Sequence, residues 1–225
     1  MNLRQLLPKN KKAKILDAGG GTGYCTVPLA EIGYHVALVD VSRQMMEIAK
    51  KKLVSMRLIE NVDFYRRDLR DLSIFENNTF DMVICQGSVL PCIQHFQRAL
   101  GEMVRVLKRD CLLNVSVHNR LFAFMNASAD EDLKHALKLY NSGRSYWFDF
   151  GAKIHALHLF TPSEIENVMM SFRIKPKKII GKIIAPQPLI EKADLHEISR
   201  VAYNMSSVQE LLGYAKYLDF TGVKM

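Results

Sequence analysis

Long apolar runs are missing from this sequence. No stretch of about 18 uncharged apolar residues occurs, which is the length that a membrane-spanning helix needs. The segment from Met1 to Lys14 carries charges and a proline, and it lacks the apolar stretch of a signal peptide. We therefore expect a soluble, cytoplasmic protein that makes no contact with a membrane.

Cysteine and metal-ligand patterns are also sparse. The four cysteines, Cys25, Cys85, Cys92 and Cys111, include no C-x-x-C pair, and the histidines include no H-E-x-x-H spacing. Cys85 and Cys111 lie in apolar, strand-like runs, where a reduced thiol behaves as a small hydrophobe. The sequence therefore predicts no disulfide, no structural zinc and no other metal site.

Size and charge exclude fewer classes of protein than the missing patterns do. With 225 residues, 48% of them hydrophobic, the chain can bury a core of its own, and its length favours one domain. The net charge of +8 permits nucleic acid as a partner, because a basic surface attracts phosphates. Many basic enzymes act on small molecules, so the charge leaves both kinds of partner open.

Strand-like and helix-like patterns alternate along the first half of the chain. Apolar runs typical of buried strands occupy residues 14–18, 34–40, 62–65, 81–85 and 111–117, and helical periodicity occupies 24–32, 42–56 and 95–107. Alternation of this kind predicts an α/β fold, in which helices cover both faces of a parallel sheet.

The alternation stops after the fifth predicted strand. Turn residues and the aromatic run Tyr146-Trp147-Phe148 mark residues 119–160 as an insertion. Thr161-Pro162-Ser163-Glu164 matches a capping box and predicts a helix, after which 173–185 resumes as one strand or two. A second capping box, Ser207-Val208-Gln209-Glu210, predicts a terminal amphipathic helix.

A glycine-rich turn follows the first predicted strand. It reads Asp17-Ala18-Gly19-Gly20-Gly21-Thr22-Gly23, and only a backbone without side chains can turn so tightly and still lie against a ligand. The dinucleotide fingerprint G-x-G-x-x-G is not met, because Tyr24 or Thr26 stands where its third glycine would be. A nicotinamide cofactor is therefore disfavoured.

The turn resembles motif I of class I S-adenosylmethionine-dependent methyltransferases, D/E-x-G-x-G-x-G, which Asp17, Gly19, Gly21 and Gly23 match in full. The resemblance covers about residues 13–118 and points to the small-molecule, UbiE-like group of that family. It implies a Rossmann-like, doubly wound, mostly parallel sheet of the seven-stranded type, with helices on both faces and an insertion after strand five.

The resemblance also implies a set of residues that bind S-adenosylmethionine and release S-adenosylhomocysteine. Asp40, at the end of the second strand, stands where the family accepts hydrogen bonds from the ribose hydroxyls. Asp68 resembles the acid that binds the adenine amino group. The full set of cofactor-binding candidates is Asp17, Gly19, Gly21, Gly23, Tyr24, Asp40, Val41, Met45, Asp68, Leu69 and Gln86.

The acceptor side is less defined by the sequence. His118, directly after the fifth strand, is our candidate for the catalytic base, since imidazole titrates near neutral pH. Tyr146 and Trp147 are candidates for lining the substrate pocket, although aromatic clusters of this kind also serve as lid or core packing.

Three functions stay open at this level. The first is methyl transfer to an O, N or C atom of a small molecule, and the second is methylation of RNA or protein. The end of the fourth strand lacks the [DNS]-P-P-[YFW] box of amino-directed base methyltransferases, which disfavours the second. The third is a non-catalytic domain that binds the cofactor as a sensor or as a partner of another subunit.

We expect a single domain over 1–225, acting as a monomer or homodimer. It divides into a cofactor-binding core at 13–118, a substrate lid at 119–160 and a helix-strand-helix completion at 161–225. Only about 13 residues precede the first strand, where many members of the family have one or two helices that close over the cofactor. The predicted terminal helix or a second subunit would take their place.

Overall fold

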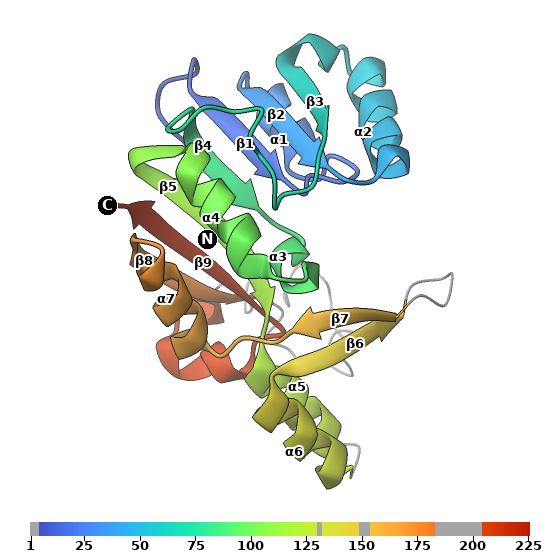
Figure 1. Cartoon of the computed structure of the whole chain (residues 1–225), viewed down its shortest axis with the longest axis vertical. Coiled ribbons are helices and arrows are strands. Elements are labelled where there is room, and N and C mark those ends of the chain that lie inside the picture. Colours follow the sequence, from blue (N-terminus) through green and yellow to red (C-terminus); the bar gives the residue numbers. More distant parts are fainter. Residues whose placement is uncertain (1–4, 130–131, 149–153, 183–203) are drawn as a thin grey trace.

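A seven-stranded sheet forms the centre of the computed structural model, which describes residues 5–129, 132–148, 154–182 and 204–225 (Figure 1). Its strand order is β3-β2-β1-β4-β5-β9-β8. The strands are β1 (Lys14–Ala18), β2 (His35–Asp40), β3 (Val62–Arg66), β4 (Phe80–Cys85), β5 (Leu107–His118), β8 (Ile174–Lys182) and β9 (Tyr217–Lys224). Because only β9 runs against its neighbours, the predicted mostly parallel α/β fold is confirmed.

Helices cover both faces of this sheet. Leu29 of α1 (Thr26–Glu31) and Met46 of α2 (Arg43–Ser55) pack on one face. The other face is covered by α4 (Phe96–Val106) and α7 (Pro162–Ser171), through side chains such as Met103 and Met169. Short turns of helix, α3 (Val89–Cys92) and the 3-10 helix η2 (Ile59–Asn61), complete the connections. The strand order reverses between β1 and β4, which is where open α/β sheets bind ligands.

The chain leaves the sheet after β5 and builds a separate small unit. It contains α5 (Arg120–Ala129), α6 (Leu133–Ser142) and the antiparallel pair β6 (Arg144–Phe148) and β7 (Ile154–His158). Figure 1 shows these elements beyond the carboxyl end of β5, away from β2 and β3. We call this unit the lid. Asn119 joins it to the segment that precedes β9, because its Nδ2 donates to the carbonyl oxygens of Leu212 and Ala215 at 2.8 and 2.7 Å.

The predicted terminal helix is wrong. The described chain has instead a 3-10 helix, η3 (Gln209–Tyr214), followed by β9, so the completion ends in a strand. The segment from Leu218 to Thr221 alternates apolar and polar side chains, and the pairing of β9 with both β5 and β8 buries all of it. Pairing with strands distant in the sequence therefore overrides the local helical pattern.

The capping box before α7 is present as predicted. The backbone N–H of Glu164 donates to Thr161 Oγ1 at 3.1 Å, and the N–H of Thr161 donates to Glu164 Oε2 at 3.4 Å. The same carboxylate accepts from Arg120 Nη2 at 2.5 Å and contacts His158 Nε2 at 2.9 Å. One glutamate therefore holds the start of α7 to the lid.

Substitution of Thr161 by alanine is expected to lower the free energy of unfolding by about 1 kcal/mol, because the Glu164 N–H loses its side-chain acceptor at the helix start. The midpoint of urea unfolding measures the effect. Ser163→Ala is the matched control, since Ser163 is exposed in the same turn, and it should change stability by less than about 0.5 kcal/mol. Equal midpoints for the two variants would contradict the role of the cap.

Candidate cofactor and acceptor site

The glycine turn lies against the end of β2. Gly19, Gly21 and Gly23 have φ angles of 75°, 50° and 79°, in the left-handed region that favours glycine. The N–H groups of Gly19 and Gly20 both donate to the Val39 carbonyl oxygen, at 2.8 and 3.2 Å. The turn is therefore fixed by backbone geometry and presents no side chain of its own to the space above it.

Asp40 ends β2 with its carboxylate held in place. Oδ2 accepts from the N–H of Gly21 at 2.9 Å, and Oδ1 accepts from the N–H of Ser42 at 2.8 Å. A carboxylate oxygen can accept more than one hydrogen bond, so each oxygen keeps a lone pair for a ligand. This arrangement suits a pair of neighbouring hydroxyl groups.

A cavity of about 270 Å³ opens beside this carboxylate, and we call it the turn cavity. The sequence candidates among its lining residues are Gly19, Asp40, Val41, Asp68 and Leu69. The ends of β1, β2 and β3 therefore bring together five residues that are well separated in the sequence. Val89 and Ile93, beside the short helix α3, add apolar walls that the sequence did not single out.

Asp68 enters the turn cavity as part of an ion pair. Arg70 Nε lies 3.0 Å from Asp68 Oδ1, and Arg70 Nη2 lies 2.6 Å from Oδ2. Hydrogen bonding to Arg70 is the main cause that holds the pKa of Asp68 below its usual value. Asp68 is therefore ionised at neutral pH, and Arg70, which lines the same cavity, is part of the site.

A second cavity, of about 500 Å³, lies over the ends of β4 and β5, and we call it the central cavity. It shares Cys92 with the turn cavity, so the two adjoin at α3. Its lining includes the predicted residues Tyr24, Gln86 and His118. The Ser88 hydroxyl also lies here, and it is buried without a hydrogen-bond partner among the described residues.

Four side chains from four strands or strand ends form a polar cluster at the base of the central cavity, namely Gln86, Asn114, Lys182 and Asp219. Lys182 Nζ lies 2.5 Å from Asp219 Oδ2 and donates to Gln86 Oε1 at 3.0 Å. Asp219 Oδ1 also accepts from Asn114 Nδ2 at 2.7 Å and from Gln86 Nε2 at 3.0 Å. The cluster fixes Gln86 at the edge of the cavity.

The sequence named only Gln86 of this polar cluster for the site. Asp219 offered a signal, because it stands between Leu218 and Phe220, both fully buried. A charged residue inside an apolar strand needs a partner. Because a terminal helix was predicted in this part of the chain, Asp219 was not interpreted as a buried strand residue.

Several sequence candidates lie outside the cavities. Asp17 is buried and accepts the Thr26 hydroxyl at 2.6 Å, and burial raises its pKa to about 6. Its position favours a structural role below the turn. Met45 is exposed on α2 and lines none of the cavities described here, and Tyr146 of β6 likewise lies outside them with 59% exposure. The side chain of Trp147 falls outside the described residues.

His118 stands at the boundary between the central cavity and a third cavity inside the lid. Its ring lies 4.9 Å from that of Tyr217, measured between centroids. Burial, and then the charge of Lys216, lower the pKa of His118 to about 4. The imidazole is therefore neutral at physiological pH and can accept a proton.

Two features are absent from the described residues. No group of three or more histidine, cysteine, aspartate or glutamate side chains has a metal-binding arrangement. No helix in these segments combines the length and apolar character needed to cross a bilayer.

The family model that describes a methyltransferase domain matches residues 15–110. Over these residues, less than half of the chain, the sequence is similar to methyltransferase domains. The match spans β1 to the first part of β5, so it contains the glycine turn, Asp40 and the turn cavity. The lid and the last two strands lie beyond it.

Two curated relatives each align with part of the chain. The ubiquinone/menaquinone biosynthesis C-methyltransferase UbiE of Brucella canis is 30% identical over 96 residues, covering 41% of this chain and 35% of that protein. The tRNA 5-carboxymethoxyuridine methyltransferase of Escherichia coli is 28% identical over 109 residues, covering 48% of this chain and 41% of that protein. The chain spans less than half the length of each of these relatives.

The whole described fold has counterparts among solved structures. A SAM-dependent methyltransferase from Methanosarcina mazei superposes with a TM-score of 0.71 over 99% of this chain and 96% of that one, at 18% identity. The similarity therefore includes the lid and the two last strands of the sheet, β8 and the antiparallel β9. At this identity it shows a shared fold.

Proposed function

We propose that this chain binds S-adenosylmethionine in the turn and central cavities and transfers its methyl group to a small-molecule acceptor. The observation that carries the proposal is the Asp40 carboxylate, which two backbone N–H groups hold at the end of β2, beside the glycine-rich turn. This is the geometry that a ribose with two free hydroxyls requires.

The residues in the turn cavity fit the rest of the cofactor. Val41, Leu69 and Val89 supply apolar surface for the adenine ring, and the ionised Asp68 can accept from its amino group. Because Cys92 borders both cavities, a ligand whose adenosine lies in the turn cavity would extend its methionine portion toward Gln86 in the central cavity.

The central cavity supports an acceptor next to the methyl donor. When bound, S-adenosylmethionine would supply an electrophilic methyl group on a positively charged sulfur. The protein positions the acceptor and excludes water. Where the acceptor atom carries a proton, neutral His118 accepts it as the new bond to carbon forms and the thioether leaves.

Asp40→Asn tests the cofactor site. The substitution removes the charge from both hydrogen bonds to the ribose, so we expect affinity for S-adenosylmethionine and S-adenosylhomocysteine to fall by about tenfold to a hundredfold in calorimetric titration. Asp63→Asn is the matched control, because Asp63 lies on the neighbouring strand β3 and pairs with the exposed His35 at 2.8 Å, outside the three cavities described. Equal affinities for both variants, or no binding by the unaltered protein, would sink the proposal.

RNA is the second candidate acceptor, because the chain has a net charge of +8 and one aligned relative is a tRNA methyltransferase. Binding of unmodified tRNA that weakens steeply with added salt would favour it, because each neutralised phosphate releases counterions. Turnover on small molecules without tRNA binding would favour the primary proposal. Cofactor binding with no turnover on either class would indicate a sensor or partner domain.

A further inference from the structure

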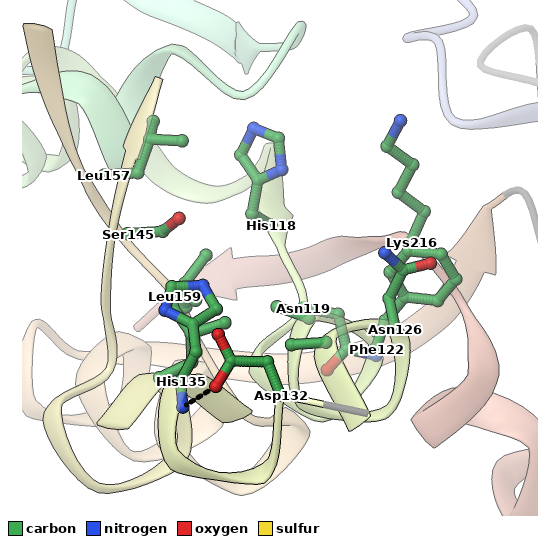
Figure 2. Close-up of a pocket in the computed structure, with 13 residues that line it drawn as sticks. His118, Asn119, Phe122, Asn126, Asp132, His135, Ser145, Leu157, Leu159 and Lys216 are labelled. Atoms are coloured by element: carbon green, nitrogen blue, oxygen red, sulfur yellow. Dashed lines mark hydrogen bonds between the residues drawn. The ribbon is translucent and has the colours of Figure 1, made fainter. Parts of the chain in front are cut away.

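The lid encloses a third cavity, of about 380 Å³, that the cofactor does not require; we call it the lid cavity (Figure 2). It adjoins the central cavity, because His118 and Leu157 line both. A molecule that enters past His118 can therefore place one end near the methyl donor and the other inside the lid. This inference rests on the proposed function and concerns the chemistry of its acceptor.

The walls of the lid cavity combine polar and apolar side chains. Phe122 of α5, Leu139 of α6 and Leu159 after β7 contribute carbon surface of the kind that covers a ring or a short chain. In Figure 2, Asp132 and His135 of α6 lie on one side of the cavity, and Lys216 lies on the other. The cavity therefore suits an amphipathic ligand with an apolar body.

Lys216 provides the charge at the rim. It lies between η3 and β9, is exposed, and has no carboxylate within ion-pair distance among the described residues. Its ammonium group instead lies 5.6 Å from the centre of the Tyr217 ring. Figure 2 shows the Lys216 and His118 side chains extending the same way in the view, toward its top. A cation that has no carboxylate partner in the described part of the chain, at the mouth of a partly apolar cavity, favours an anionic ligand.

We propose that the lid cavity binds the methyl acceptor and that Lys216 selects acceptors that carry an organic anion, such as a carboxylate, beside an apolar body of about the size of a benzene ring. The charged end of the acceptor stays at the exposed rim while its body fills the lid. Lys216 is then a specificity-determining residue, and His118 lies next to the bound anion.

Binding of an anion also changes the environment of His118. The ionisable side chains that share a cavity with His118 are Tyr24, Cys92, Lys182 and Tyr217 on the central side, and Asp132, His135 and Lys216 on the lid side. The charge of Lys216 lowers the pKa of His118, so an anion that pairs with Lys216 raises that pKa again. Binding of the acceptor would thus raise the pKa of His118, the side chain that accepts the proton that the acceptor loses.

Benzoate and its neutral counterpart benzamide test this proposal on the protein loaded with S-adenosylhomocysteine. We expect benzoate to bind in the millimolar range, about threefold to fivefold more tightly than benzamide, since an exposed ion pair contributes up to about 1 kcal/mol. Nuclear magnetic resonance of the His118 ring, assigned with His118→Asn, should show its pKa rising by about half a unit or more with benzoate alone.

Lys216→Met should abolish both the preference for benzoate and the shift at His118. Lys138→Met is the matched control, because Lys138 is exposed on α6 and does not line the lid cavity. Equal binding of benzoate and benzamide, no binding of benzoate, or a Lys216→Met variant that keeps the preference would overturn the proposal. Calorimetry with S-adenosylhomocysteine on the same samples separates this failure from failure of the cofactor site.

Discussion

Gly19→Ala is expected to weaken binding of S-adenosylmethionine by more than about 100-fold, equivalent to about 2.7 kcal/mol. A Cβ on Gly19 would lie 2.6 Å from Cγ1 of Val89, which lines the same cavity. The two groups must separate, and Val89 or the turn then moves into the volume assigned to the cofactor. The φ angle of 75° adds strain, because left-handed backbone costs an L residue roughly 1–2 kcal/mol.

Gly33→Ala separates these two causes. Gly33 has a φ angle of 88°, but a Cβ there would meet nothing within 4 Å, and it lies after α1 outside the turn cavity. We therefore expect Gly33→Ala to lower stability through strain and to leave cofactor affinity unchanged. Thermal unfolding and calorimetric titration of both variants provide the comparison.

Parallel losses of affinity in the two glycine variants would mean that Gly19→Ala acts through general destabilisation. In that case the close approach of Gly19 and Val89 would not shape the binding site. A loss confined to Gly19→Ala would place the cofactor against the glycine turn, as proposed.

The first five strands could be predicted because their signals are local. The run around Leu16, for instance, is apolar and ends at a glycine turn, and the structure pairs it in parallel with both β2 and β4. The helix start at Thr161 is equally local, since both partners of its capping box lie within one turn. Such patterns need no knowledge of distant contacts.

The carboxy-terminal strands depend on distant contacts, and the sequence therefore predicted them less well. Residues after Ser207 carry a plausible helix start, yet Leu218 pairs with Val117 of β5 and with Gly181 of β8. The central position of β9 buries both of its faces, so the polar side chains of Asp219 and Thr221 are buried along with the apolar ones, although the alternation from Leu218 to Thr221 is typical of a half-exposed strand.

The candidate site also contains residues with local signals and residues that depend on distant contacts. Asp40 and the glycine turn belong to a compact motif, so their positions could be predicted from spacing. The polar cluster joins Gln86, Asn114, Lys182 and Asp219, which lie far apart in the sequence and meet only in the folded sheet. Lys216 and the lid cavity also need the placement of η3 next to α5.

Asp219→Ala is expected to cause the largest loss of stability, about 3 kcal/mol, and to lower the melting temperature by about 6–12 °C. The Asp219 side chain is 8% exposed and serves three donors, on Lys182, Asn114 and Gln86. Asn114 is itself buried, and its Nδ2 keeps the Phe220 carbonyl oxygen and Thr221 Oγ1 as acceptors, at 3.2 and 3.0 Å. The cost therefore comes from the lost hydrogen bonds to a charged group, each about 1.5–3 kcal/mol where it is buried, and the partly exposed Lys182 contributes less than that.

Asp81→Ala is the matched control for the loss of a lysine–aspartate pair in the same sheet. Asp81 lies 2.7 Å from Lys108, but these side chains are 27% and 41% exposed, so water replaces much of what is lost. We expect a cost of about 1 kcal/mol or less. Thermal and urea unfolding of both variants measures the difference.

Lys182→Met separates the contribution of the ion pair to stability from that of the amide N–H groups that donate to Asp219. In that variant the Asp219 carboxylate keeps the amide N–H donors of Asn114 and Gln86, so the cost should be clearly smaller than for Asp219→Ala. Equal costs would mean that the ion pair alone stabilises the end of the sheet. A smaller cost, together with altered acceptor binding, would show that the carboxylate organises the amides while Lys182 serves the central cavity.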